Sequence, residues 1–148
     1  MQEAIEYIIQ FLLYGDEQGA QQVGYTADES LWPNYRVVVV PNGQMGKQIV
    51  LPTEADLELR IEKQGNTHIV RTDVIYNTFF YISRAEELLV GERDEHGRFL
   101  AKHSMLGQKN RLMIPLIDEY SRAMMKMLDI ALPEPGFSHI YLTHDIDT

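Results

Sequence analysis

The sequence predicts an α/β (or α+β) domain: a mixed sheet centred on residues 36–40, with about three principal helices packed on it. YRVVVV (Tyr35–Val40) is a continuous, largely β-branched run that a proline ends, which is typical of a strand buried on both faces. Apolar residues also recur at helical spacing in three segments: 2–14, 73–90 and 115–130. A chain of 148 residues suits one such domain.

Each predicted helix has a recognisable boundary residue. Gly15 is placed to end the first helix. Thr72 or Asp73 can cap the second, because a short oxygen side chain accepts the free N–H groups of the first turn, and Gly91 is placed to end it. Pro115 opens the third helix, where a missing N–H costs nothing.

The remaining predicted elements are shorter. A short strand is expected at residues 22–25 and another at 48–52. Alternating apolar and charged residues at 57–62, followed by a turn and by residues 67–70, predict a hairpin. Residues 91–110 are polar and long for a connection, so they form either a functional loop or a mobile one.

The composition of the C-terminal region predicts a domain boundary. LPEPGF (residues 132–137) holds two prolines and a glycine, so it cannot continue the third helix. We therefore expect an N-terminal domain at residues 1–131, a linker at 132–137, and at 138–148 a strand that begins another domain, whose barrel is missing from this chain. With its barrel neighbours missing, that strand could instead add to the edge of the first domain's sheet.

Charge and composition exclude several classes of function. A formal charge of −9 argues against a nucleic-acid partner, because binding to a phosphate backbone relies on clustered Lys and Arg. The chain has no cysteine, and therefore neither a disulfide nor a thiolate site. Glu3 and Glu6 stand where a signal peptide would carry basic residues, and no apolar stretch has the roughly 20 residues of a membrane span. A cytoplasmic location is expected.

Charged residues of both signs gather where the second predicted helix ends. They are Arg84, Glu86, Glu87, Asp94, His96 and Arg98. One interpretation is a network of ion pairs that pins the long connection to the helix. The other is a site for a polar ligand, since mixed charges beside aromatic residues also suit such ligands.

The final residues, YLTHDIDT, carry two acids at positions i and i+2. In an extended run Asp145 and Asp147 point the same way, which is how a site for a metal or a proton begins. No two of the five histidines are four residues apart, so a helical histidine pair for a metal is absent. A solvated D-x-D is the alternative interpretation.

Four stretches, in order, are shared with a known family: FFYISRAEELL, DEHGRF, IPLIDEY and YLTHDIDT. Together they resemble the N-terminal region of bacterial polysaccharide-deacetylase-like proteins, a domain of unknown function that precedes a NodB-homology catalytic domain (carbohydrate esterase family four). The resemblance runs from about residue 70 to the end of the chain, and more faintly before it.

The resemblance implies roles for the terminal acids in a longer parent protein. Asp145 would be the general base, and Asp147 would bind a divalent metal, usually zinc in that family, with two histidines from a later HxxxH. Thr143 and His144 open the motif, and Ile146 separates acids that are more often adjacent. The metal would polarise the acetyl carbonyl and its bound water while the base removes a proton.

Without the downstream imidazoles, this chain is expected to bind no metal and to be inactive. The predicted function is a non-catalytic accessory domain, with the downstream catalytic domain as its partner and carbohydrate as the parent's substrate. The alternative is a self-contained module that binds a ligand or a protein. A complete small enzyme using the paired carboxylates is the weakest prediction, because such chemistry needs burial that separates the two pKa values.

Overall fold

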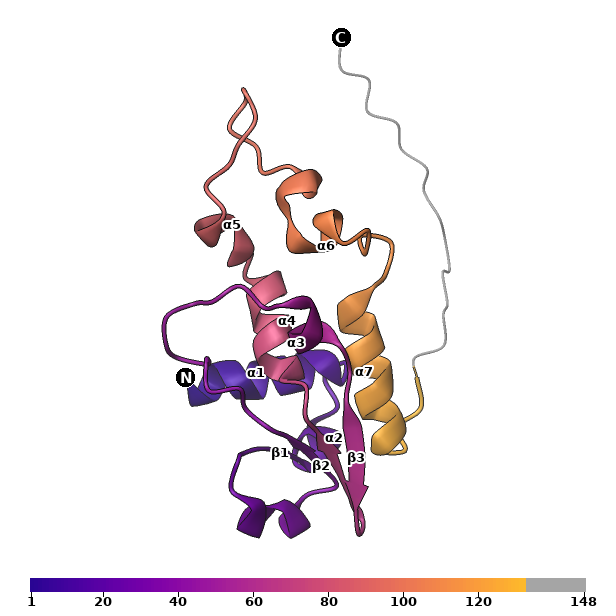
Figure 1. The fold of residues 1–148 in the computed structure, drawn as a ribbon. Helices are drawn as coiled ribbons and strands as arrows, with labels where there is room; N and C mark the ends of the chain where they lie inside the picture. The colour runs from indigo at the N-terminus through magenta and orange to yellow at the C-terminus, as the bar shows by residue number, and fades with distance from the viewer. Residues whose placement is uncertain (133–148) are drawn as a thin grey trace.

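The computed structural model describes residues 1–132 and contains a four-stranded sheet with helices around it (Figure 1). In chain order the elements are α1 (Gln2–Leu12), α2 (Glu17–Ala20), β1 (Val23–Tyr25), the 3-10 helix η1 (Glu29–Asn34), β2 (Val37–Val39), α3 (Glu54–Leu57), β3 (Ile61–Gln64), β4 (Thr67–Val70), α4 (Val74–Ile82), α5 (Glu86–Leu89), the 3-10 helix η2 (Ala101–His103), α6 (Met105–Gln108) and α7 (Leu116–Met127). In this part of the chain no helix is long and apolar enough to cross a membrane.

The sheet has the order β1-β2-β4-β3. Strand β2 pairs in parallel with β1 and with β4, whereas β3 and β4 form an antiparallel hairpin. The predicted mixed α/β fold is therefore confirmed. The three valines of β2 are fully buried, which confirms that this strand is covered on both faces.

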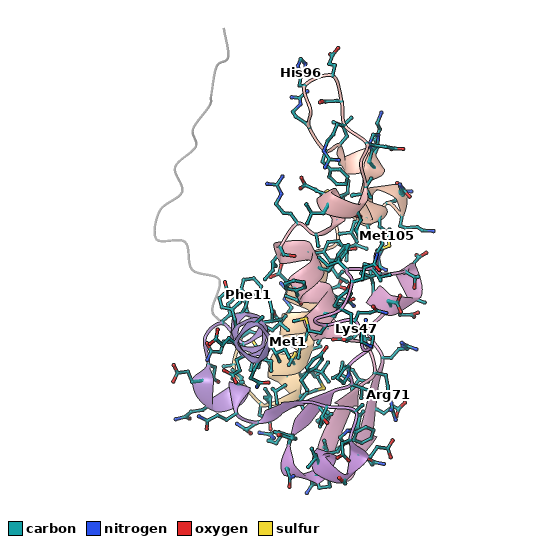
Figure 2. The ribbon with its side chains drawn as sticks, turned by 90° about the vertical axis from the view of Figure 1, so that its left-hand side faces the viewer. Met1, Phe11, Lys47, Arg71, His96 and Met105 are labelled. Atoms are coloured by element: carbon teal, nitrogen blue, oxygen red, sulfur yellow. The ribbon has the colours of Figure 1, made fainter. Side chains whose placement is uncertain are left out.

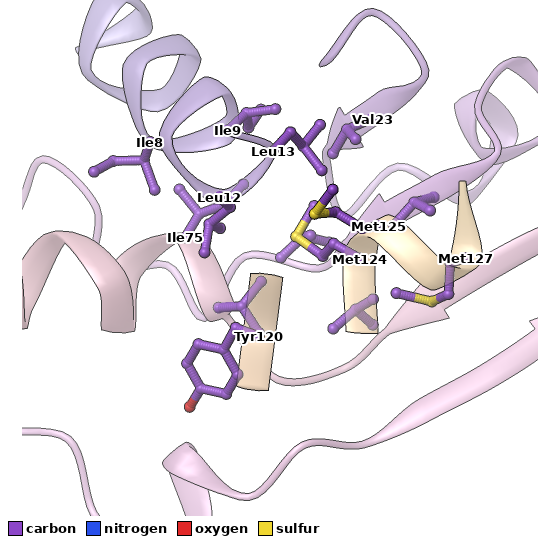
Figure 3. Close-up of a cluster of buried hydrophobic side chains, with 14 of the residues drawn as sticks. Ile8, Ile9, Leu12, Leu13, Val23, Ile75, Tyr120, Met124, Met125 and Met127 are labelled. Carbon is purple, nitrogen blue, oxygen red and sulfur yellow. The ribbon is translucent and has the colours of Figure 1, made fainter. Parts of the chain in front are cut away.

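The two faces of the sheet have different covers. Val37 and Val39 belong to the main core with side chains of α1 and α7, while Val38 faces the other side and packs with Trp32 of η1. Figure 3 shows the main core, in which the aliphatic side chains of α1 meet the methionines of α7. Its labelled members are Ile8, Ile9, Leu12, Leu13, Val23, Ile75, Tyr120, Met124, Met125 and Met127.

The second predicted helix, 73–90, is wrong as a single element. Helix α4 ends at Ile82, and α5 begins only at Glu86. Arg84 adopts a positive φ of 56° in between, and the N–H of Ala85 donates to the carbonyl of Phe80, which closes the end of α4. Glycine usually takes this left-handed position, so an arginine there gave no signal of a helix end.

Two further predictions need correction. Residues 48–52 are not a strand; they lead into α3, where Thr53 and Asp56 form a reciprocal capping box. The predicted hairpin is present, but its first strand begins at Ile61 because α3 occupies Glu54–Leu57. The 91–110 connection is partly ordered into η2 and α6, and in Figure 1 it lies with α5 at the end of the molecule opposite the sheet.

The other two helices are confirmed with slightly shorter bounds, as α1 and α7. The predicted strand at 138–148 lies outside the described residues. Residues 84–111, which contain α5, η2 and α6, are called the arm below.

Candidate functional site

The predicted polar cluster divides into separate local pairs on the arm. Arg84 pairs with Glu87 at 2.6 Å, within three residues, and Arg98 pairs with Asp94 at 2.8 Å inside one turn. The hydrogen bonds from Arg84 lower the pKa of Glu87, and the backbone N–H of Arg98 lowers that of Asp94. The side chains of the two arginines are exposed, whereas those of Glu87 and Asp94 are only 26% and 14% exposed. Because each pair has an exposed partner and joins residues close in sequence, it contributes little to stability.

The remaining two members of the cluster have different surroundings. Glu86 is buried, and its carboxylate accepts a 2.6 Å hydrogen bond from the N–H of Met105, which joins α5 to the first turn of α6. His96 is exposed, 3.5 Å from Glu95, at the tip of the arm (Figure 2). These interactions therefore join parts of the arm to one another, and Glu86 is the one buried residue among the six of the predicted cluster.

The predicted catalytic and metal-binding residues are Asp145 and Asp147, with Thr143 and His144 opening their motif. All four lie outside the described residues. Within residues 1–132, no group of three or more His, Asp or Glu side chains is arranged to hold a metal ion.

One buried acid joins the ends of the parallel strands. Asp73 caps α4 by accepting from the N–H of Tyr76, and it also accepts from the hydroxyl of Tyr25 and the N–H of Asn42, each at 2.9 Å. Burial raises the pKa of Asp73 and that of Tyr25, although the donated hydrogen bonds partly offset the shift of the acid. Because its carboxylate already accepts from these three donors, Asp73 acts as a structural connection between β1, the residues after β2 and α4.

An exposed apolar surface lies on α1. Tyr7 and Phe11 lie one turn apart on the side of α1 that faces solvent, and Tyr14 follows two residues after the end of this helix; their surfaces are 61%, 44% and 57% exposed. The rings of Tyr7 and Phe11 stack with centroids 6.4 Å apart. Ile82, at the end of α4, adds a fourth exposed side chain beside them. We call these four residues the α1 aromatic surface; Figure 2 shows Phe11 well apart from the tip of the arm.

The α1 aromatic surface borders a groove of about 510 Å³. Besides these four residues, Ile117, Asp118 and Ser121 of α7 line it, together with Gln10 and Gly15. The hydroxyl of Tyr14 lies 3.5 Å from a carboxylate oxygen of Asp118. The groove is mainly apolar with a few polar groups at its sides, and among residues 1–132 no lysine or arginine lines it.

The backbone at Tyr14 is strained. Its φ is +53°, in the left-handed region that costs a side-chain-bearing residue about 1 kcal/mol or more. Gly15 follows with a φ of +83°, and its N–H bonds to the carbonyl of Gln10 to close α1. Arg84, Asn110 and Asp129 adopt the same left-handed conformation just after α4, α6 and α7, so the conformation of Tyr14 belongs to the end of α1.

The sequence-based predictions did not include this surface, because they used only the apolar residues on the buried side of α1. The signal was nevertheless present: Tyr7, Phe11 and Tyr14 recur at intervals of four and three residues, on the side of the helix opposite Ile5, Ile9 and their neighbours. Aromatic residues on the polar side of an amphipathic helix indicate a contact surface.

Comparison with known proteins gives one family. No curated protein matches the chain, and no solved structure does. A family described as "Family of unknown function (DUF7033)" matches residues 17–133, a region that begins just after α1 and includes the sheet, the arm and α7. Since this match spans well over half of the chain, the protein belongs to the DUF7033 family.

Proposed function

We propose that this DUF7033 domain is a non-catalytic accessory domain of a polysaccharide-deacetylase-like protein, and that its α1 aromatic surface packs against the catalytic domain that follows in the parent chain. In that parent, N- or O-acetyl groups are removed from carbohydrate by metal-assisted hydrolysis. Asp145 serves as general base and Asp147 as a ligand of zinc, as the family resemblance implies.

The observation that carries the proposal is the α1 aromatic surface. Single exposed apolar residues are normal on any protein, but a contiguous group with three aromatic rings marks an interaction surface. Tyrosine and phenylalanine are enriched in protein interfaces, where large rigid rings bury area at little cost in side-chain entropy.

A domain of the same chain is the favoured occupant because the connection is short. The linker expected at residues 132–137 spans at most about 20 Å when fully extended. A domain attached in this way stays near the surface of residues 1–132 at a high effective concentration, so that even a modest interface is occupied. Since the described part of the chain places no lysine or arginine around the groove, these residues make a poor site for an anion.

One feature favours the alternative, a self-contained binding module. Gln10, Asp118 and Ser121 place an amide, a carboxylate and a hydroxyl beside the rings, and such groups can hydrogen-bond the hydroxyls of a saccharide. A saccharide lying on the rings would then use the same surface.

Hydroxyl-radical footprinting separates the two functions. We expect the rings of Tyr7 and Phe11 to be oxidised readily in the 148-residue chain and to be protected in a longer chain that includes the catalytic domain. Tyr7→Ala with Phe11→Ala should loosen the two domains in the longer chain, measured as faster proteolysis of the linker. Leu88→Ala is the matched control, since Leu88 is 78% exposed on the arm and lies outside the surface.

Equal oxidation of both rings in the short and long chains would contradict the docking proposal. Protection of the same rings in the 148-residue chain by an acetylated chitooligosaccharide would support the binding module instead. The catalytic part has its own test: the 148-residue chain should release no acetate, and zinc-dependent release from it would contradict an accessory role.

A further inference from the structure

Strand β1 leaves one edge of the sheet unpaired. Along its other edge, hydrogen bonds at Gln22 and Thr26, on either side of the strand, join it to β2. Because backbone groups alternate along a strand, those of Val23 and Tyr25 face the free edge, where neither has a backbone partner among residues 1–132. Val23 is only 6% exposed, so little water can replace the missing partner. A backbone group in such a place favours a hydrogen bond from another chain.

This free edge lies along a groove of about 780 Å³, called the β1 groove below. One wall is formed by α1 and α2, on the face of the sheet where Val23 joins the main core. The other wall is formed by Leu31 and Tyr35, on the opposite face, where a Cβ on Gly24 would be 2.5 Å from the ring of Tyr35. The layers on both sides of the sheet therefore contribute to the groove, and a further strand in it would be covered on both faces.

The opposite edge of the sheet is protected by charge. Strand β3 is exposed along its whole length and carries Glu62 and Lys63, and charges of this kind keep other chains from pairing with an edge. Strand β1 has the sequence VGY, which carries no charge. Its free edge faces the β1 groove, which has room for an extended segment.

The charge of the β1 groove is negative. Glu6 of α1 and Glu17 of α2 line the wall on the side of the main core, and among residues 1–132 no lysine or arginine lines the groove. Neither glutamate forms an ion pair within the described part of the chain. The amide of Gln2 donates to Glu6 at 2.9 Å, and a neutral amide leaves the charge of the carboxylate in place. Such a wall attracts Lys or Arg and repels an acidic chain.

We infer that the β1 groove binds an extended segment of another protein, with Lys or Arg at alternate positions, which pairs with β1 as a fifth strand. The general mode is strand addition to an exposed sheet edge. Main-chain hydrogen bonds to Val23 and Tyr25 supply affinity, while the side chains that alternate between the two walls supply specificity.

Side-chain alternation along the bound segment fits the two walls. On one side, the aliphatic stem of a lysine or an arginine lies against Ile5 of α1, and its charged end reaches Glu6 or Glu17. On the other side, the wall is formed by Leu31 and Tyr35, so apolar side chains suit it. The segment that fits best therefore alternates basic and apolar residues.

A second copy of this chain is a poorer occupant. If two copies paired through β1 in one continuous antiparallel sheet, their walls of α1 and α2 would lie on the same face, with Glu6 and Glu17 of one copy beside those of the other. Like charges in such a position repel, and each chain carries a formal charge of −9. A basic segment gains from the same carboxylates, so charge complementarity selects it as the occupant.

Titration of the 148-residue chain with a basic peptide tests the inference. The probe has about seven residues, with lysine and valine in alternation and both ends blocked. Glu6→Gln with Glu17→Gln should weaken binding about tenfold, because two ion pairs at the groove are lost. The matched control, Glu3→Gln with Glu95→Gln, removes two charges outside the groove and should change the affinity by less than about twofold. Equal weakening in both variants would show general attraction of charge and would overturn the inference.

Pairing of the two backbones has its own measurement. With the peptide at saturation, the N–H groups of Val23 and Tyr25 should exchange with solvent about tenfold or more slowly than in the free chain, while those of β3 keep their rate. Methylating the peptide nitrogens of one alternate set should abolish binding, and methylating the other set should leave it, because only one set of N–H groups faces β1. Equal loss of binding with both methylated peptides would overturn strand pairing.

Three other results would overturn the inference. Slow exchange of Val23 and Tyr25 before any peptide is added would show that another part of the chain already covers the edge. A dimer of the 148-residue chain that the peptide dissociates would show a second copy as the occupant. No binding of the lysine–valine peptide, or equal binding of a glutamate–valine peptide, would show that the acidic wall does not select a basic segment.

These measurements are independent of the proposed function. They use a chain without the catalytic domain, and they change residues outside the α1 aromatic surface. Failure of peptide binding would leave that surface and its footprinting test untouched, and failure of domain docking would leave the β1 groove untouched.

Discussion

Replacing Tyr14 by glycine and by alanine should separate the strain at this position from the function of its ring. Both changes remove an exposed ring whose hydrogen bond to Asp118 is long, at 3.5 Å, so the packing lost is small and the same in each. Alanine keeps the unfavourable φ of about +53°, whereas glycine adopts it freely. The left-handed region costs a residue with a Cβ about 1 kcal/mol, so Tyr14→Gly should be more stable than Tyr14→Ala by about that amount.

This order is the reverse of the usual one, since glycine inside a helix is about 1 kcal/mol less stable than alanine. Urea unfolding followed by fluorescence is a suitable assay, because Trp32 is the only tryptophan and is 3% exposed. A difference of this size shifts the midpoint by about 0.5 M. If alanine proves as stable as glycine, the backbone at residue 14 is not strained and the reasoning is refuted. Both variants should lose domain docking equally.

Three further predictions concern the stability of the fold. Tyr120→Phe should cost about 2 kcal/mol of unfolding free energy, measured in urea, because the carbonyl of Leu57 loses its 2.8 Å buried hydrogen bond; a cost under about 0.5 kcal/mol would contradict this. Gly107→Ala should speed amide exchange across the arm with little change in the global midpoint, since a Cβ would lie 1.8 Å from the carbonyl oxygen of Ala101; unchanged exchange would show that the arm accommodates it. Burial raises the pKa of Asp73 in the folded state, so the contribution of this residue to the free energy of unfolding is full below about pH 3.9 and is lost as the pH rises through the folded pKa. The stability of the wild type relative to Asp73→Asn should therefore fall over that range of pH. A rise would refute the sign.

The fold was predictable where the pattern of apolar residues was strong. The Val37–Val39 run and the stripes of α1 and α7 have the periods that buried strands and amphipathic helices require, and the structure confirms them. The end of α4 was not predictable, because tertiary contacts hold Arg84 in a conformation normally taken by glycine. Residues 48–52 failed as a strand because a short apolar run has no period of its own, and the capping box of α3 dominates there.

The candidate site was less predictable than the fold. The charge of the polar cluster was visible, but sequence spacing could not say whether six charged side chains meet; most of them pair with their nearest neighbours instead. The groove of about 780 Å³ beside β1 has no sequence signature, because its walls come from α1, α2 and the segment around η1, which only the folded chain brings together.

Helix α1 should be indispensable to the domain although the family match begins at residue 17. Ile8, Ile9, Leu12 and Leu13 are between 0% and 6% exposed in the main core, and each fully buried aliphatic side chain contributes about 2 kcal/mol. Their combined loss is comparable with the whole unfolding free energy of a small domain, about 5–15 kcal/mol. A chain that begins at residue 16 should therefore lack a cooperative unfolding transition and a dispersed amide spectrum. A folded truncated chain would show that the domain does not need α1 for its stability. The α1 aromatic surface would then need another explanation.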